Sequence, residues 1–396
     1  MTPLGYELDL QILSRGHDGK REWFTPRVGV IPPYTAVLLM SPSSLHGSDV
    51  FYTMHAMRSD DLGATWSQPI PQPGLGRTAF ADDVDICPCD MVPGWHAATG
   101  RLLALGNTAC YRPGEAAPIS DNSQPIFASY AVYDEPGHAW SQWRALELPD
   151  ADKFYWAAGG AAQRVDLPDG DVLWPMYCMS KDSVGANFWK SCFFATVVRC
   201  RFDGETLTYI EHGDELTVPD VRGLCEPSLT VHQGRHYMTL RNDVRGYVTT
   251  SEDGLRFGDL VAWRFDDGTE LGSYNTQQHW VTHSDGLLLV YTRRGADNDH
   301  VFRHRAPLFM AQVDPERLCV VRSTERVLMP DKGGQFGNGG VCAASSAETW
   351  VTDAESMLGD AKDPMNIELS TGRGCDNRVY LGRILWDVPN HSRGLS

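Results

Sequence analysis

The segment SDDLGATW, residues 59–66, is the part of the sequence that says most about the fold. The short side chain of Asp61 can accept hydrogen bonds from nearby backbone N–H groups, Gly63 tolerates an unusual backbone conformation, and Trp66 can pack inward. These features predict a tight hairpin turn between two strands. Looser copies of the pattern occur at residues 251–257 and 134–140. A turn that recurs along a chain indicates a repeated unit of β-structure.

A second pattern repeats along the whole chain: a turn, often Asp-Gly, followed by an apolar strand that ends in a polar residue. Its copies lie at 33–41, 99–108, 169–177, 233–242, 285–294 and 347–355. They are about 50 to 70 residues apart, which is the length of a propeller blade of four short strands. No long segment has apolar residues at helical spacing. We therefore expect an all-β, six-bladed β-propeller with little helix, in which residues 1–396 form one domain.

The strand YELDLQIL, residues 6–13, has no partner of its own before the first blade begins. In closed propellers, a terminal strand of this kind completes the last blade and so removes an exposed sheet edge. We expect the same closure here.

Charge excludes several classes of partner. The formal net charge is −17, from 51 acidic and 34 basic residues, and no run of Lys or Arg stands out. Nucleic acids and anionic membranes require a basic surface, so neither is expected as a partner. The same negative charge repels an anionic ligand at long range. An acidic substrate would therefore have to be captured by a local cluster of arginines.

The remaining composition gives no sign of a membrane span or a cofactor. No stretch approaches the roughly 20 apolar residues that cross a bilayer, and the first residues lack the pattern of an export signal. The ten cysteines are scattered rather than grouped as a disulfide framework or as zinc ligands. Such usage favours reduced thiols. We expect a cytoplasmic protein with no metal and no cofactor.

The segment 59–66 matches the S-x-D-x-G-x-T-W turn known as the Asp box, and the chain resembles the sialidase superfamily of six-bladed propellers over most of its length. Residues 159–177 resemble the third blade of that superfamily, and residues 224–242 resemble the fourth. Asp boxes also occur in propellers that are not enzymes, so they indicate the scaffold and not the activity.

The resemblance implies a site in which three arginines hold a substrate carboxylate. Arg27 resembles the first of them, Arg241 the second, and Arg293 or its neighbour Arg294 the third. The residue type suits the task, because a guanidinium is planar, binds a carboxylate through two hydrogen bonds and stays charged at any working pH.

The resemblance also implies a set of catalytic residues, which this sequence matches only in part. Glu226 lies before Arg241 at a spacing similar to that of the glutamate that activates a tyrosine nucleophile in the superfamily. The position expected for that tyrosine falls in 333–341, which contains none, and Tyr274 in the fifth unit is the substitute. Asp49 is the candidate for the acid/base aspartate. These departures weaken the expectation of ordinary sialic-acid hydrolysis, while an acidic-sugar pocket is still expected.

The fifth unit is rich in histidine and arginine. His279 and His300 are candidates for acid/base work or substrate contacts, since histidine titrates near neutral pH. Gln278 and Trp280, in NTQQHW (275–280), offer a polar amide and an apolar ring face for a sugar. By residue types, this pattern resembles propellers that act on rhamnosyl-glucuronate linkages as hydrolases or lyases.

Three functions follow from these residues. The first is an exo-glycosidase of sialidase-like architecture acting on a glycan with an anionic sugar. The second is a uronate lyase or a rhamnosidase on the same scaffold, in which a histidine such as His279 moves the proton. The third is a glycan-binding propeller without catalysis.

Overall fold

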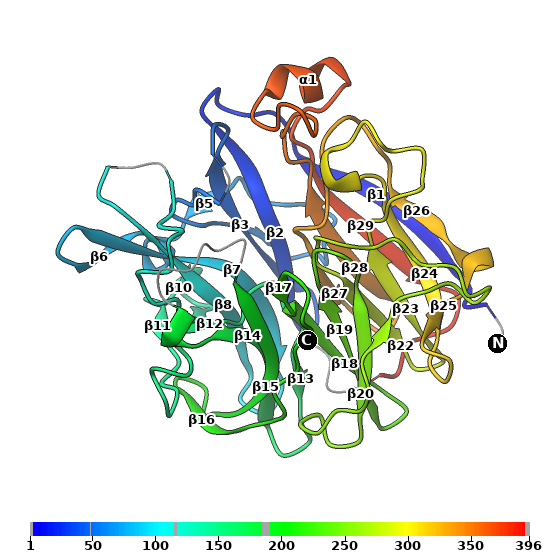
Figure 1. Cartoon of the computed structure of the whole chain (residues 1–396), viewed down its shortest axis with the longest axis horizontal. Coiled ribbons are helices and arrows are strands. Elements are labelled where there is room, and N and C mark those ends of the chain that lie inside the picture. The colour runs from blue at the N-terminus through cyan, green and yellow to red at the C-terminus, as the bar shows by residue number, and fades with distance from the viewer. Residues whose placement is uncertain (1–2, 48, 115–116, 184–190, 393–396) are drawn as a thin grey trace.

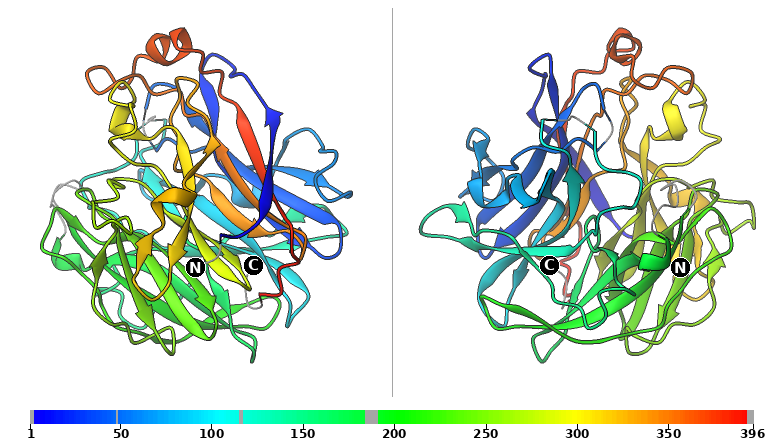
Figure 2. Two further views of the ribbon diagram at one scale, coloured as in Figure 1. Left: turned by 90° about the vertical axis from the view of Figure 1, so that its right-hand side faces the viewer. Right: turned by 60° about the vertical axis from the view of Figure 1, so that its left-hand side comes forward.

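The computed structural model describes residues 3–47, 49–114, 117–183 and 191–392. These ranges fold into six largely antiparallel sheets set around a common axis (Figures 1 and 2). The expected all-β, six-bladed β-propeller is confirmed. The sheets are called blades 1 to 6 in chain order.

In most blades the strands run outward from the axis in chain order; the first strand of blade 2 and the outermost strand of blade 6, which comes from the N-terminus, are the exceptions. Blade 1 contains β2 (Arg21–Ile31), β3 (Thr35–Ser44), β4 (His55–Ser59) and β5 (Ile70–Pro71). Blade 2 contains β6 (Thr78–Ala81), β7 (Val84–His96), β8 (Arg101–Tyr111), β9 (Ala128–Asp134), β10 (Ala139–Trp140) and β11 (Arg144–Ala145). Blade 3 contains β12 (Trp156–Ala158), β13 (Val165–Asp166), β14 (Asp171–Met179), β15 (Cys192–Phe202), β16 (Leu207–His212) and β17 (Arg222–Gly223).

The second half of the chain repeats this order. Blade 4 contains β18 (Cys225–His232), β19 (Arg235–Arg241), β20 (Tyr247–Ser251) and β21 (Val261–Ala262). Blade 5 contains β22 (His279–His283), β23 (Gly286–Tyr291), β24 (Leu308–Asp314), β25 (Cys319–Val320) and β26 (Arg326–Met329). Blade 6 contains β27 (Gly340–Ala343), β28 (Glu348–Ala354), β29 (Val379–Trp386) and β1 (Tyr6–Ser14).

The N-terminal strand closes the propeller, as expected. β1 pairs antiparallel with β29, from Tyr6 opposite Trp386 to Ile12 opposite Tyr380. The ring of blades is thereby closed by main-chain hydrogen bonds between the two ends of the chain, and the edge of β29 is covered.

The core lies between neighbouring blades, because each inner and middle strand is buried on both faces. β28, for example, is buried at every position. Trp174, Trp263, Trp280 and Trp350 are the largest side chains with almost no exposed surface. Helix is scarce: in the described part of the chain the only α-helix is α1 (Ile367–Gly372).

The hairpin turn at 59–66 forms between the third and fourth strands of blade 1. Ser59 Oγ accepts a hydrogen bond from the amide of Gly63 (2.8 Å), and the carboxylate of Asp61 accepts bonds from the amide and the hydroxyl of Thr65 (2.8 and 2.6 Å). The indole of Trp66 donates to the carbonyl of Gly63 (3.2 Å). The polar side chains therefore satisfy the backbone of the turn, as the sequence pattern predicts.

The looser copies occupy the same place in other blades. In blade 4, Ser251 accepts from the amide of Gly254 (2.8 Å), and Asp253 accepts from the amide of Leu255 (2.8 Å). In blade 2, Asp134 accepts from the amide of Gly137 (3.1 Å). The three turns connect β4 to β5, β20 to β21 and β9 to β10, which are corresponding outer hairpins of the three blades.

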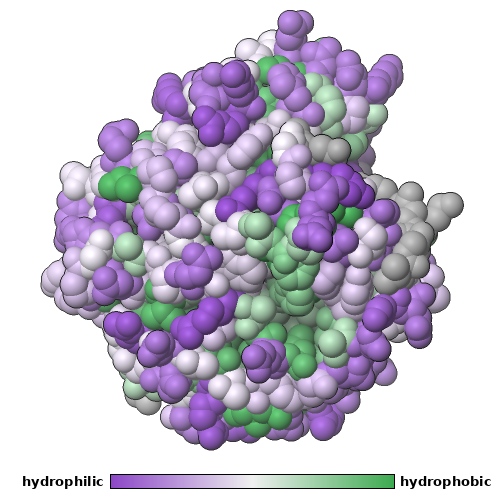
Figure 3. All heavy atoms as spheres, turned by 90° about the vertical axis from the view of Figure 1, so that its left-hand side faces the viewer, coloured by the Kyte–Doolittle hydropathy of each residue, from purple (hydrophilic) through white to green (hydrophobic). Residues whose placement is uncertain are grey.

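The side of the molecule in Figure 3 is mostly hydrophilic, with hydrophobic residues gathered mainly in one hollowed region. No helix in the described ranges is long and apolar enough to cross a membrane. All ten cysteines lie within these ranges as free thiols, nine of them buried.

Candidate active site

One backbone feature recurs at the inner edge of every blade. At or just before its innermost strands, each blade has a residue with a left-handed backbone, and we call these six positions the inner ring. They are Thr25 (φ 51°), Asp90 (φ 54°), Ala161 (φ 59°), Glu226 (φ 43°), Asn275 (φ 53°) and Gly337 (φ 94°). In β2, β7 and β18 the position coincides with a β-bulge. Bulges re-aim side chains, and strained residues of this kind gather at functional sites.

The inner ring is chemically asymmetric. Blades 2, 4 and 5 carry the carboxylate and amide side chains of Asp90, Glu226 and Asn275, whereas the other three blades carry Thr, Ala and Gly. At Gly337 a side chain would not fit, because an added Cβ would lie 2.0 Å from Thr276 Oγ1. The polar side chains of the candidate site therefore come from equivalent positions on three blades.

Glu226 is paired with Arg241, which ends the neighbouring strand β19. Arg241 Nη1 lies 2.7 Å from Glu226 Oε2, and Arg241 Nη2 donates to Asn275 Oδ1 (3.1 Å). Burial acts to raise the pKa of Glu226, but the charge of Arg241 and its hydrogen bond outweigh it and hold that pKa below its usual value. Glu226 is therefore ionised at neutral pH. Behind this pair, Asp243 links Arg241 to Arg222, at 3.5 Å from each.

Arg305 is a buried cation beside this pair. Its Nε and Nη2 donate to the carbonyl of Asn275, and no carboxylate of the described residues lies within ion-pair distance of it. Burial, together with the charges of Arg241 and Arg303, lowers the pKa of Arg305 to about 9. The same two causes, burial and the Arg241 charge, lower the pKa of Arg303. A buried guanidinium without a paired anion is costly.

The loop that carries both arginines is strained and firmly held. Arg303 and His304 both have left-handed backbones, with φ of 58° and 54°. The buried amide of Asn298 donates to the carbonyls of His304 (3.1 Å) and Ala306 (2.7 Å), and the hydroxyl of Tyr274 bonds to His304 Nδ1 (2.6 Å). Strained residues that are held in place by surrounding hydrogen bonds are common in ligand-binding loops.

Arg27 already has partners on every side of its guanidinium. It forms an ion pair with Asp90 (3.0 Å) and donates to the carbonyl of Gly339 (3.0 Å) and to Gln277 Oε1 (3.2 Å). Its side chain is 1% exposed. Burial raises the pKa of Asp90, Arg27 opposes this, and the charges of Glu226 and Asp49 add to the rise. Arg27 thus holds Asp90 and presents no open edge to a ligand.

Asp49 lies in the connection between β3 and β4, on the exposed side of the cluster. Its charge acts to raise the pKa of Asp90 and that of Arg305, so its carboxylate is within electrostatic reach of both. The structure therefore brings Asp49, Glu226 and Arg241 together with Asp90 and the two arginines of the blade 5 loop.

Arg293, Arg294 and His300 do not join this cluster. Arg293 is held by Glu325 (2.7 Å), and Arg294 by Glu270 (3.3 Å). His300 bonds to Asp331 (2.8 Å) and Arg294 lies over the ring of Tyr274. Arg293 and Arg294 follow the end of β23, where the chain has already turned into the 293–306 loop. The arginine of the blade 5 loop whose charge does act on Glu226 is Arg305.

Residues 278–280 are internal rather than a sugar platform. Trp280 is 0% exposed, and its indole donates to the carbonyl of Ser228 (3.0 Å). Gln278 is buried and accepts from the hydroxyl of Thr239 (2.6 Å). His279 bonds to Ser228 Oγ (3.1 Å), and burial lowers its pKa to about 3. The expected open ring face at Trp280 is therefore wrong, because β22 is buried on both faces.

Several residues of the cluster escaped sequence reasoning. Asp90 and Asn275 can be assigned to the site only because they occupy inner-ring positions in the structure. No sequence pattern marks those positions. Tyr177, on β14, belongs to the same surroundings: burial and the charge of Glu226 raise the pKa of its phenol. Arg303 and Arg305 lie in the segment that is dense in histidine and arginine, and that density was their only signal.

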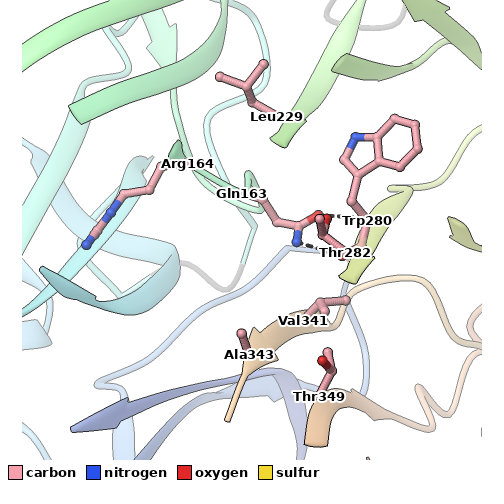
Figure 4. Close-up of a pocket in the computed structure, with 8 residues that line it drawn as sticks. All are labelled: Gln163, Arg164, Leu229, Trp280, Thr282, Val341, Ala343 and Thr349. Carbon is pink, nitrogen blue, oxygen red and sulfur yellow. Dashed lines mark hydrogen bonds between the residues drawn. The ribbon is translucent and has the colours of Figure 1, made fainter. Parts of the chain in front are cut away.

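A cavity deeper in the channel is not the site. Its lining includes Gln163, Thr282 and Thr349, and none of the clustered arginines and carboxylates contributes to it (Figure 4). The amide of Gln163 bonds to both the N–H (2.6 Å) and the carbonyl (2.9 Å) of Trp280 and so links blades 3 and 5. The cavity volume of about 20 Å³ holds about one water molecule and no sugar.

Among the described residues, no group of three or more His, Cys, Asp or Glu side chains is arranged to hold a metal ion.

The fold defines the class: a six-bladed propeller of the sialidase-like type. No protein-family model and no curated protein matches the chain in sequence.

Solved structures do match it. A Dyadobacter fermentans protein of unknown function is 14% identical, with a TM-score of 0.58 over 95% of this chain and 99% of that one. A Trypanosoma rangeli sialidase is 13% identical, with a TM-score of 0.57, covering 97% of this chain and 60% of that one. A sialidase of Streptococcus pneumoniae is 10% identical, with a TM-score of 0.60, covering 94% and 70%. At these identities the likeness shows the fold alone.

Proposed function

We propose that this protein is an exo-acting glycosidase that cleaves the bond to a sugar carrying a carboxylate. The observation that carries the proposal is Arg305, a buried cation with no carboxylate of the described residues in ion-pair distance, set beside Arg241 and Arg303. An anionic ligand would supply the missing counter-charge in a desolvated place, where a charge-assisted hydrogen bond is strongest. Sialidases among the solved neighbours support an anionic sugar as that ligand.

The roles follow from the positions. Arg303 and Arg305 receive the carboxylate of the sugar, while Arg241 holds Glu226. Asp49, at the exposed side, is the acid that donates a proton to the leaving oxygen. Glu226, ionised at neutral pH, stabilises the positive charge that develops on the sugar ring as the bond to the leaving oxygen breaks. Water then adds to the anomeric carbon and gives one proton to the Asp49 carboxylate, which returns Asp49 to its acid form.

The lyase alternative loses its candidate base. A lyase needs a group that takes a proton from the carbon next to the carboxylate, and the best group has a pKa near the working pH. The pKa of His279 is about 3 because the ring is buried, and the ring is already bonded to Ser228. The hydrolase is therefore the better-supported reading.

The test is an assay with sialyl-lactose, a rhamnosyl-glucuronate oligosaccharide and a neutral glycan, following released sugar and the ultraviolet absorbance of an unsaturated uronate. We expect cleavage of an acidic glycan without the ultraviolet signal. An ultraviolet signal would establish a lyase instead, and tight binding without turnover would make the protein a glycan-binding propeller.

A further inference from the structure

The turn that carries Asp49 is held from the neighbouring blade. Tyr111 ends β8 in blade 2, and its hydroxyl donates to the carbonyl of Asp49 (2.7 Å) while accepting from the amide of Phe51 (3.0 Å). Tyr111 is 0% exposed. One buried hydroxyl thus fixes backbone groups on both sides of the turn that presents the Asp49 carboxylate.

A second side chain completes this support. Arg77 lies flat over the Tyr111 ring, with its Cζ 3.7 Å from the ring centroid, and its Nε donates to the carbonyl of Phe51 (3.0 Å). Burial raises the pKa of Tyr111 well above its ordinary value, so the hydroxyl keeps its proton and continues to donate. The hydroxyl therefore remains a donor at neutral pH.

The turn needs such support. Asp49 has a left-handed backbone (φ 59°), a conformation that costs free energy for most residues other than glycine, and the residue is exposed. An exposed turn with a strained residue keeps one conformation only when its surroundings impose it. The hydroxyl of Tyr111 and the guanidinium of Arg77 are two groups that impose it here.

We propose that Tyr111 is a positioning residue that holds the Asp49 carboxylate over the arginine and carboxylate cluster. This inference rests on the proposed function, in which Asp49 donates the proton. Tyr111 does not touch the sugar, and its effect passes through the carbonyl of Asp49. Displacement of a catalytic group by about 1 Å can cost about 100-fold in rate.

The experiment is the substitution Tyr111→Phe, which keeps the ring and its stacking on Arg77 and removes only the hydroxyl. We expect kcat to fall about 10- to 100-fold with little change in KM, because the arginines that bind the sugar are untouched. In an Asp49→Asn background the same substitution should have almost no further effect. Tyr133→Phe is the matched control, since the Tyr133 hydroxyl bonds to Arg58 (3.3 Å) in the outer part of the blade.

Hydrogen exchange of the Phe51 amide separates this inference from the proposed function. If wild-type protein cleaves no glycan, faster exchange at Phe51 in Tyr111→Phe still supports the positioning role, and unchanged exchange overturns it. If the protein is active, an equal loss of kcat with and without Asp49→Asn overturns it. Should Tyr111→Phe fail to fold, Arg77→Lys removes the donor to the Phe51 carbonyl, and the same kcat and exchange changes are required of it.

Discussion

At the scale of single residues, the site depends on buried charged side chains, which have no access to water and need an oppositely charged partner. Arg27 and Asp90 satisfy one another, as do Arg241 and Glu226. Arg305 has no such partner among the described residues, and this difference is the reason why we propose that it receives a ligand. The role of a buried charged residue is thus inferred from the partner that it has in the structure, and not from its residue type.

Gly337 is the inner-ring position where any side chain is excluded. Its φ is 94°, and a Cβ would meet Thr276 Oγ1 at 2.0 Å. We expect Gly337→Ala to lower the free energy of unfolding by more than about 1 kcal/mol and to reduce activity, since both the backbone and the contact oppose it. Urea denaturation measures the first and the glycan assay the second. Gly372→Ala, in open space on α1, is the control and should be nearly neutral.

Glu22 gives a pH dependence of stability that is independent of the site. Burial raises its pKa to about 7, although the amide of Met357 and the hydroxyl of Ser356 oppose the rise. The folded protein therefore binds the extra proton between about pH 4.5 and 7, and the associated stability, on the order of 3 kcal/mol, is lost as the pH rises through 7.

The substitution Glu22→Gln should remove that loss. We expect the free energy of unfolding of the variant to gain on wild type from pH 5 to about pH 7 and the difference to level off above that, measured by urea denaturation at each pH. The exposed Glu368→Gln should leave the wild-type pH dependence unchanged. A constant difference between Glu22→Gln and wild type at all pH values would contradict the assignment.

At the scale of elements, strands were easier to predict than the loops between them. The strand pattern and the turn at 59–66 rest on local residue types, and the structure confirms both. The approach of Glu226 to Arg241 follows from their places on adjacent strands, β18 and β19. The route of the 293–306 loop depends on Asn298 and on two left-handed residues, which no spacing rule indicates. The sequence therefore points to Arg293 or Arg294, which are held by Glu325 and Glu270, whereas Arg305 is the arginine of this loop that lies near Glu226.

Asn298 is the element-scale test of that loop. The substitution Asn298→Ala removes the donor to the carbonyls of His304 and Ala306. The backbone that carries Arg303 and Arg305 is then no longer held in place. We therefore expect binding of an acidic sugar to weaken about 10-fold or more. Asn377→Ala is the matched control: its amide donates to the carbonyls of Trp23 and Glu355 away from this loop. It should cost stability without changing affinity, and an equal loss of affinity in both variants would contradict the prediction.

At the scale of the whole molecule, closure of the ring determines whether six blades can hold one site. The inner ring draws its polar side chains from blades 2, 4 and 5, so their relative placement depends on a continuous circle of blade contacts. The sequence predicts this closure because strand 6–13 otherwise lacks a partner, and β1 does pair with β29. The inner ring itself was not predictable, since its six members share a backbone conformation and no residue type.

Removal of residues 1–14 should open the ring. We expect a marked fall in melting temperature and self-association through the uncovered edge of β29, followed by calorimetry and size-exclusion chromatography. Glu7→Ala, on an exposed position of β1, is the control and should behave like wild type. A truncated chain that stays monomeric and melts at the wild-type temperature would show that β1 is dispensable.

The central claim is that Arg305 awaits the carboxylate of a sugar. The most direct measurement is calorimetric binding of sialyl-lactose and the rhamnosyl-glucuronate oligosaccharide, each as free acid and as methyl ester, to wild type, Arg305→Met and Arg293→Met. We predict that wild type and Arg293→Met bind a free acid about 30-fold or more tightly than its ester, and that Arg305→Met loses this preference. Equal binding of acid and ester by wild type, or a preference that survives in Arg305→Met, would contradict the account.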